Sequence, residues 1–260
     1  MNSRFGHLEF ESHENPPDEQ EFNEPTLGQD QMAEAIHAFE HEEFANALQR
    51  YARILEFESE NQESWIGQVQ SLLQLNRTEE ALNWANRAVE LFPSNPDLQA
   101  LTSIALARNG NIAEALAYSD SASRASTKSV IPWLSRAEIL AIQGDSTADY
   151  CEARAWAISP EKWQIAWLCS RMRTRHKQNA KALKWALSAV EQAPTHPTPW
   201  VLTARCQAAL ALTSQAQESI ERAHQLTPNS SRVCKLMKEL EKPKGLGDIL
   251  KGLRFRSRSA

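Results

Sequence analysis

The chain has 260 residues, and 42% of them are hydrophobic, slightly below the usual share for a globular protein. Its formal net charge is -5 at pH 7, which excludes a global basic field that would draw it onto nucleic acid. We find no run of about 18 apolar residues and no secretory signal, so we expect no membrane span. The 4 cysteines are too far apart for a CxxC pair, which favours buried thiols, a reducing compartment and a cytoplasmic protein.

Residues 1–28 differ in composition from the rest of the chain. They are rich in acidic residues and contain Pro16, Pro17 and Pro25. Their few apolar residues lack a helical or strand period, so they cannot bury enough surface to offset the entropy of ordering. We therefore predict a disordered acidic head, followed by a folded unit over residues 29–241.

A helical period begins near Asp30, with apolar residues three and four apart and a break between Glu40 and Glu43. This pattern predicts a first helical hairpin, and five similar hairpins follow to Pro228. An alanine recurs in mid-hairpin at steps of 34 residues, with one step of 33, at Ala47, Ala81, Ala115, Ala148, Ala182 and Ala216. A second register runs beside it at Pro93, Thr127, Pro160, Pro194 and Pro228. After the last hairpin, Ser230 or Ser231 is the expected N-cap of a final helix.

With this period, the chain resembles the tetratricopeptide repeat family over residues 30–240. The resemblance is carried by the second unit, WIGQVQSLLQLNRTEEALNWANRAVELFP, and by the matching positions of the other units. The resemblance implies an all-α fold, a right-handed α-α superhelix of about six helical hairpins plus a C-terminal capping helix. The small alanines would let the two helices of a hairpin approach closely. The fourth unit is one residue short, so we predict irregular stacking at units three and four.

Signals for chemistry are weak. His37 and His41 are four apart with Glu42 adjacent, but the HExxH order of a zinc peptidase is missing, so surface histidines are the simpler interpretation. Three glycines near the C-terminus lack the ending of a phosphate loop. We predict no catalytic, cofactor-binding or metal site, and a protein that is not an enzyme.

The resemblance also implies a ligand surface on the concave face, built mainly by the first helix of each unit. Helical geometry from the tryptophan register then selects the inward-facing positions. The candidate peptide-binding residues are Ile66, Gln70, Ile104, Arg108, Trp167, Arg171, Arg175 and Arg205. This groove is apolar at its N-terminal end and basic at its C-terminal end. The basic run at residues 171–181 is either a solvated face or a site for an acidic peptide.

Residues 242–260 form a basic tail that either docks on a partner or an anionic surface, or stays disordered. We expect a scaffold or adaptor that binds a protein or peptide segment in its concave groove, where an acidic segment would suit the basic end. Two alternatives remain: an RNA-binding helical repeat using the same arginines, and an accessory subunit of a larger assembly. The acidic head is expected to compete weakly for the basic end of the groove.

Overall fold

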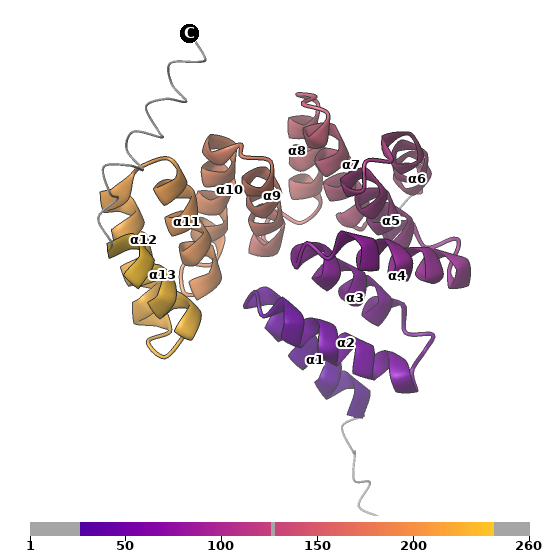
Figure 1. The fold of residues 1–260 in the computed structure, drawn as a ribbon, viewed down its shortest axis with the longest axis horizontal. Coiled ribbons are helices and arrows are strands. Elements are labelled where there is room, and N and C mark those ends of the chain that lie inside the picture. Colours follow the sequence, from indigo (N-terminus) through magenta and orange to yellow (C-terminus); the bar gives the residue numbers. More distant parts are fainter. Residues whose placement is uncertain (1–26, 126–127, 242–260) are drawn as a thin grey trace, which may run out of the picture.

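The computed structural model describes residues 27–125 and 128–241, which form helices and no strand (Figure 1). In chain order the helices are α1 (Leu27–Glu40), α2 (Phe44–Phe57), α3 (Gln62–Gln74), α4 (Thr78–Leu91), α5 (Pro96–Arg108), α6 (Ile112–Arg124), α7 (Ile131–Ile142), α8 (Ala148–Ile158), α9 (Trp163–Arg175), α10 (Asn179–Gln192), α11 (Pro197–Ala209), α12 (Thr213–Leu226) and α13 (Ser231–Glu241). The expected all-α fold of six hairpins and a capping helix is confirmed for this part of the chain. Residues 1–26 and 242–260, which include most of the expected acidic head and the whole basic tail, lie outside the described residues.

The alanine register marks where the two helices of each hairpin approach each other most closely. Ala47, Ala81, Ala115, Ala148 and Ala182 have no exposed surface, and Ala216 is 1% exposed. Each lies in the second helix of its hairpin. Because a larger side chain would push the paired helices apart, these positions require a small residue.

The turn inside each hairpin contains one residue in the left-handed region of the backbone. These residues are Glu42, Asn76, Gly110, Gly144, Lys177 and Ala211, with φ between 57° and 87°. They are 34 residues apart except for one step of 33, so the turn follows the same register as the alanines. Glycine adopts this conformation without steric cost, and asparagine tolerates it better than most residues.

The loop after each hairpin follows the proline register. Pro93, Pro160, Pro194 and Pro228 each lie two residues beyond the last residue of the preceding helix. A proline disfavours helical backbone at the residue before it, which explains why these helices end where they do. Asn61 and Asn95 cap the helices that follow, since their side chains accept hydrogen bonds from backbone N–H groups of the first turn.

The packing of unit four on its two neighbours is uneven, and the sequence predicts irregular stacking at units three and four. α8 has 11 residues, whereas α4, α10 and α12 have 14. α5 packs extensively on α7, while α8 and α9 touch only sparsely along their backbones. Large side chains, including those of Trp156 and Trp185, fill the space between units four and five.

The first helices of successive units contact one another and line the inside of the curve, so α3, α5, α7, α9 and α11 form the concave face. The superhelix also meets itself (Figure 1). The α1–α2 turn reaches across to α9, where Gln164 Nε2 donates a hydrogen bond of 2.6 Å to Glu40 Oε1. Arg232 of α13 donates a hydrogen bond of 2.6 Å to the carbonyl of His41 in the same turn.

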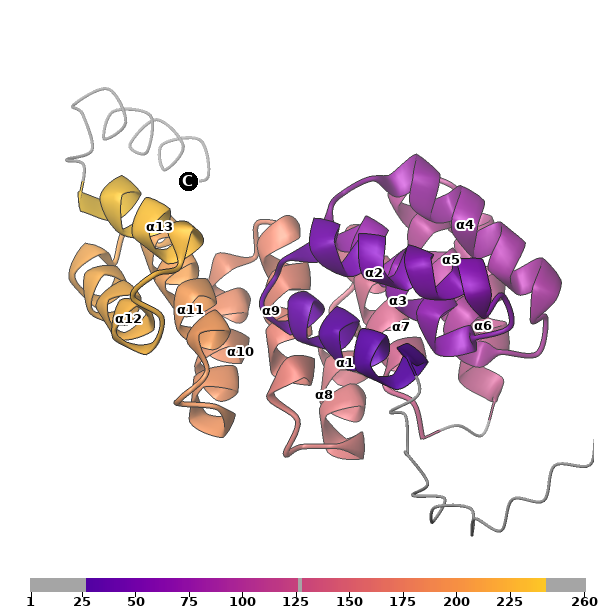
Figure 2. The ribbon, with the colours of Figure 1, turned by 90° about the horizontal axis from the view of Figure 1, so that it is seen from below.

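Helix α13 covers the open end of the last hairpin, beside α12 (Figure 2). Ser230 is its N-cap, since Ser230 Oγ accepts a hydrogen bond of 3.4 Å from the backbone N–H of Val233. Val233 and Leu236 are buried against Val201 and Ile220. The expected capping role of this segment is confirmed.

The cysteines carry free thiols, with Cys151, Cys169 and Cys206 buried and Cys234 partly exposed. Burial raises the pKa of the Cys169 thiol well above its ordinary value, which keeps that group protonated. None of the described helices combines the length and the apolar character needed to cross a membrane.

Candidate functional site

A cleft in the concave face contains four of the candidate residues. Gln70, Ile104, Arg108 and Arg175 come from α3, α5 and α9 and line a cavity of about 50 Å³ that is partly open to solvent. Its other lining residues are mostly apolar, and they include Leu73, Leu101, Ile131, Leu134, Leu168 and Met172. The helical register therefore selected residues that the superhelix brings together.

A buried carboxylate lies at the polar edge of this cleft. Glu138 on α7 accepts hydrogen bonds of 2.8 and 2.9 Å from the Nε and Nη2 groups of Arg108. Arg175 Nη1 donates a third, of 3.1 Å. Burial opposes ionisation, but Arg108, the hydrogen bond from His176 and the charge of Arg175 hold the pKa of Glu138 well below its ordinary value. Glu138 is therefore a carboxylate that positions both arginines.

The other basic candidates surround a second carboxylate, and we call this group the Glu42 site. It consists of Glu42, Trp167, Arg171, Arg205 and Arg232. The Glu42 side chain is only 3% exposed and accepts hydrogen bonds from Trp167 Nε1 at 2.9 Å and Arg171 Nη1 at 2.6 Å. Arg232 forms a close ion pair with the other carboxylate oxygen, from which Arg205 Nη1 is 3.5 Å away.

The two carboxylates do not neutralise the arginines around them. Glu138 and Glu42 face five arginines, which leaves an excess of three positive charges over these two groups. Burial, together with repulsion from Arg108 and Arg171, lowers the pKa of Arg175 to about 10. The concave face consequently favours an anionic group.

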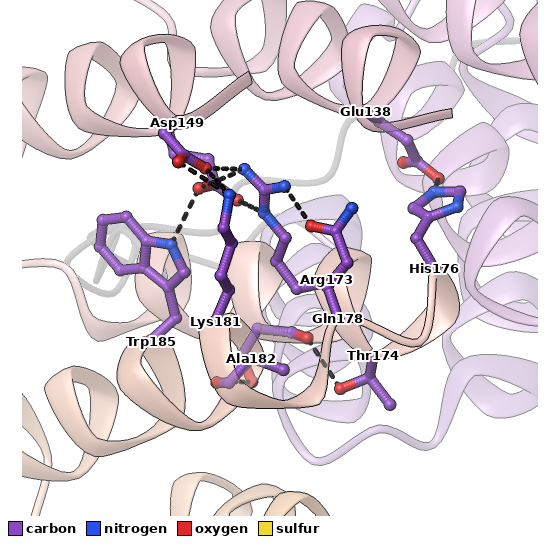
Figure 3. Close-up of polar contacts among 11 residues, drawn as sticks. Glu138, Asp149, Arg173, Thr174, His176, Gln178, Lys181, Ala182 and Trp185 are labelled. Carbon is purple, nitrogen blue, oxygen red and sulfur yellow. Dashed lines mark hydrogen bonds and ion pairs between the residues drawn. The ribbon is translucent and has the colours of Figure 1, made fainter. Parts of the chain in front are cut away.

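The basic run at residues 171–181 is divided between two sides of α9. Arg171 and Arg175 face the concave surface, whereas Arg173 points toward α8 and α10 and is 1% exposed (Figure 3). Its Nε and Nη2 groups donate hydrogen bonds of 2.6 and 2.8 Å to Glu152. Lys181 joins the same network through hydrogen bonds to Asp149. Arg173 therefore holds units four and five together and is unavailable to a ligand, whereas the side chain of Lys181 is half-exposed.

Two further sets of residues lie outside the cleft and the Glu42 site. Ile66 is partly buried and packs with the apolar cores of units one to three. His37 and His41 stack with ring centroids 4.0 Å apart, and the His41 ring is 4.7 Å from that of His196. In the part of the chain that the structure describes, no group of three or more His, Cys, Asp or Glu is arranged to hold a metal ion.

Sequence reasoning missed Glu42, Glu138 and Arg232. Glu138 lies on α7, which supplies none of the candidate residues, and Arg232 lies on the capping helix. Glu42 lies at the turn position that Asn76, Gly110, Gly144, Lys177 and Ala211 hold in later hairpins, and this position alone does not single it out. At the basic end of the groove, where we expected the acidic head to bind, Arg171 and Arg205 already pair with Glu42 of the first hairpin, and Arg175 pairs with Glu138.

The comparisons with known proteins support this fold. Residues 32–96 match the tetratricopeptide repeat family profile. No curated protein matches the chain by sequence. Among solved structures, a tetratricopeptide repeat protein from Parabacteroides merdae aligns with a TM-score of 0.51 and 16% identity, over 85% of this chain and 87% of its own. One from Thermus thermophilus aligns with a TM-score of 0.54 and 20% identity, over 71% and 99%.

A third similar structure is IFIT1, which is matched both as the human dimer with PPP-AAAA and as a monomeric mutant with Gppp-AAAA. The mutant aligns with a TM-score of 0.58 and 18% identity, over 82% of this chain and 53% of IFIT1. This chain therefore spans about half the length of that protein. At these identities the likeness is one of fold. Residues 32–96 thus match the tetratricopeptide repeat profile, and the thirteen described helices have the fold of a tetratricopeptide repeat solenoid.

Proposed function

We propose that the protein is a non-enzymatic scaffold that binds a segment of a partner protein in its concave face. The observation that supports this most directly is the cleft between α3, α5, α7 and α9, a cavity of about 50 Å³ that opens to solvent. A cavity with an apolar floor and a few polar groups at its edge is typical of a binding site.

The chemistry of the cleft favours an apolar side chain with an acidic neighbour. Leu73, Leu134 and Met172 offer an apolar floor, and the guanidinium groups of Arg108 and Arg175 lie at one edge. Ser135 Oγ also lines the cleft, is buried, and has no hydrogen-bond partner among the described residues.

The free, mostly buried thiols support a reducing compartment, and we propose that the protein is cytoplasmic. Binding in this compartment would involve a folded groove and an extended or helical segment of another protein. Such segments gain affinity when their side chains fill preformed pockets.

The test is a selection of displayed peptides against the full chain, followed by affinity measurements on purified variants. We expect selected peptides to combine an apolar residue with a glutamate or aspartate. Gln70→Glu, which adds a negative charge at the edge of the cleft, should weaken their binding about tenfold through like-charge repulsion. Fluorescence anisotropy with a labelled peptide measures this change.

Gln215→Glu is the matched control, because it makes the same change on the exposed surface of α12. It should leave the peptide affinity unchanged. Selected peptides whose affinity responds equally to both variants would place their binding site elsewhere on the molecule. That result would rule out the cleft as the binding site.

A second candidate is single-stranded RNA, and the five arginines of the concave face support it. IFIT1, which has a similar fold, is seen with PPP-AAAA and Gppp-AAAA. If five phosphates were neutralised, affinity would fall about 100-fold between about 50 and 200 mM salt. Binding of 5′-phosphorylated oligoadenylate with this salt dependence, and without affinity for selected peptides, would favour RNA over a protein segment.

A further inference from the structure

The Glu42 site already contains a ligand-like segment of this chain. Residues 39–44 read Phe-Glu-His-Glu-Glu-Phe and form the end of α1 and the α1–α2 turn. The segment is 120 or more residues away in sequence from the groups that bind it on α9, α11 and α13. Its contacts show in detail what the concave face accepts at its basic end.

Aromatic contacts bracket the central carboxylate. The ring of Phe39 meets that of Trp167 edge-on, with centroids 5.7 Å apart, and the ring of Phe44 is stacked at 6.2 Å from Trp167. The guanidinium carbon of Arg171 lies 4.6 Å from the centroid of Phe44 and 5.6 Å from that of Trp167. The site therefore recognises a glutamate with one aromatic residue three positions before it and another two positions after it.

The backbone at Glu42 is strained. Its φ of 57° is in the left-handed region, which is unfavourable for a glutamate. Asn76, Gly110, Gly144, Lys177 and Ala211 hold the same place in hairpins two to six. At position 42 the contacts that the side chain makes across the molecule offset the strain of this conformation.

The site also has more positive charge than Glu42 can neutralise. Arg171, Arg205 and Arg232 share this one carboxylate, and the side chain of Arg205 remains 41% exposed. Burial lowers the pKa of Arg232, and repulsion from Arg205 and Arg171 lowers it further. A ligand that brings two acidic residues would compensate these charges better than the α1–α2 turn does.

We propose that the Glu42 site is a binding site for an acidic–aromatic segment of a partner protein, and that the α1–α2 turn occupies it as an internal competitor. The proposal rests on the function proposed above in taking the concave face as the binding surface, and it adds a second site to the cleft. A partner segment of the form Phe-x-x-Glu-x-Phe replaces Glu42 among the arginines. The turn then leaves α9 and α13, and the closed superhelix opens.

The aromatic partners favour a peptide over a nucleic acid. The carboxylate of Glu42 lies between Trp167 Nε1 and the guanidinium of Arg171, in a space closed by the rings of Phe39 and Phe44. These rings belong to the competing segment itself, so a replacement must supply its own aromatic side chains at the same spacing. A protein segment can do this in six residues.

The test uses the full chain and a labelled peptide with the sequence of residues 38–45, AFEHEEFA. The first variant is Glu42→Gly, which removes the internal carboxylate and gives the turn the residue found at positions 110 and 144. If the closed form is at least about 90% populated, Glu42→Gly should bind the peptide at least about tenfold more tightly than the wild type. A peptide with glutamine at the position of Glu42 should lose about tenfold or more in affinity.

Two further variants separate the site from the turn. Ala211→Gly relieves the same backbone conformation in the sixth hairpin without changing the Glu42 site, so its peptide affinity should equal that of the wild type. Glu42→Gln keeps the shape of the side chain and removes only its charge, and it should resemble Glu42→Gly. In small-angle X-ray scattering, saturating peptide should enlarge the radius of gyration of the wild type toward the value for Glu42→Gly.

Each other outcome overturns the proposal in a distinguishable way. Equal peptide affinity of wild type and both Glu42 variants would show that the turn does not compete. Binding of cleft-selected peptides that depends on Gln70, with no binding of AFEHEEFA to any variant, would remove the Glu42 site and leave the proposed scaffold function intact. No binding of any peptide would overturn both. A 5′-phosphorylated oligoadenylate that Glu42→Gly binds more tightly than AFEHEEFA would assign the site to RNA.

Discussion

Arg173 illustrates how a charged residue stabilises the interior of this solenoid. It bridges α8 and α10 through Glu152 and Gln178, and its side chain is 1% exposed. Burial alone would lower the pKa of Arg173, but the hydrogen bonds and charge of Glu152, with the charge of Asp149, raise it above its ordinary value. A buried pair of this kind contributes mainly because either partner alone would be a buried, unpaired charge.

We predict that Arg173→Met destabilises the protein by about 3–5 kcal/mol, because Glu152 would then be a buried carboxylate without its ion partner. Urea unfolding followed by circular dichroism measures the change. The double variant Arg173→Met/Glu152→Met should recover much of the lost stability, since it removes both charges together. Destabilisation by the double variant that equals or exceeds the sum of the two single effects would contradict this account.

At the scale of single elements, α13 has two roles. Its apolar face covers Val201 and Ile220 at the end of the last hairpin, which would otherwise be exposed. Its first turn carries Arg232, which reaches the carboxylate of Glu42 in the first hairpin. The helix is thus both the cap of unit six and one wall of the Glu42 site.

Removing residues 231–260 should therefore destabilise the protein strongly. Val233 and Leu236 are both buried in α13, and burial of such side chains contributes about 1.5–3 kcal/mol each, so we expect a loss of about 3–6 kcal/mol. Thermal and urea unfolding measure it. Removing only residues 242–260 is the control, because it retains all of α13 and should leave the unfolding free energy nearly unchanged. A similar loss for both truncations would show that stability depends on the tail.

The elements themselves could be predicted from the sequence because their signals are local. A helix of the hairpin needs its apolar stripe, its alanine and its terminal proline, and all three lie within one 34-residue unit. The short α8 was also detectable as a missing residue in the registers around Ala148. Inward-facing residues such as Ile104 and Arg108 follow from helical geometry once the concave face is known.

The Glu42 site could not be predicted in the same way. Glu42 and Arg232 are 190 residues apart, and their contact depends on the summed curvature of five unit-to-unit steps. A small error in each step would move α13 away from the turn. The packing of unit three on unit four, where the register changes, contributes to that curvature. The sequence does not specify the angle of this packing as clearly as it specifies the helices.

At the scale of the whole molecule, the closure contact includes a cluster of rings. His196 caps α11, lies 4.7 Å from His41 and 4.5 Å from Trp163 between ring centroids, and is near His37. Burial, followed by repulsion from His41 and His37, lowers the pKa of His196 from 6.5 to about 4. The neutral imidazole is therefore the form compatible with closure.

We predict that His196→Asn reduces the loss of stability on acidification. Between pH 6.5 and about 4, His196 takes up a proton in the unfolded chain before it does so in the folded protein, so stability falls as the pH decreases through this window. Asparagine keeps the cap, as Asn61 and Asn95 do at their helices, and does not titrate. Urea unfolding at pH 7 and pH 5 should show a smaller difference for the variant than for the wild type. Equal differences would mean that His196 does not contribute to the pH dependence.

The contact of Glu42 with α9 and α13 changes how the repeats cooperate. In an open array each unit touches only its neighbours, so the two ends fray first and unfolding spreads inward. Here the first unit is joined to the fifth and to the cap, and the array has the connectivity of a closed loop. Neither end can detach without breaking contacts on both sides, just as a middle unit would. The terminal hairpins of this protein are therefore as costly to detach as middle units, and a short array unfolds with the cooperativity of a longer one.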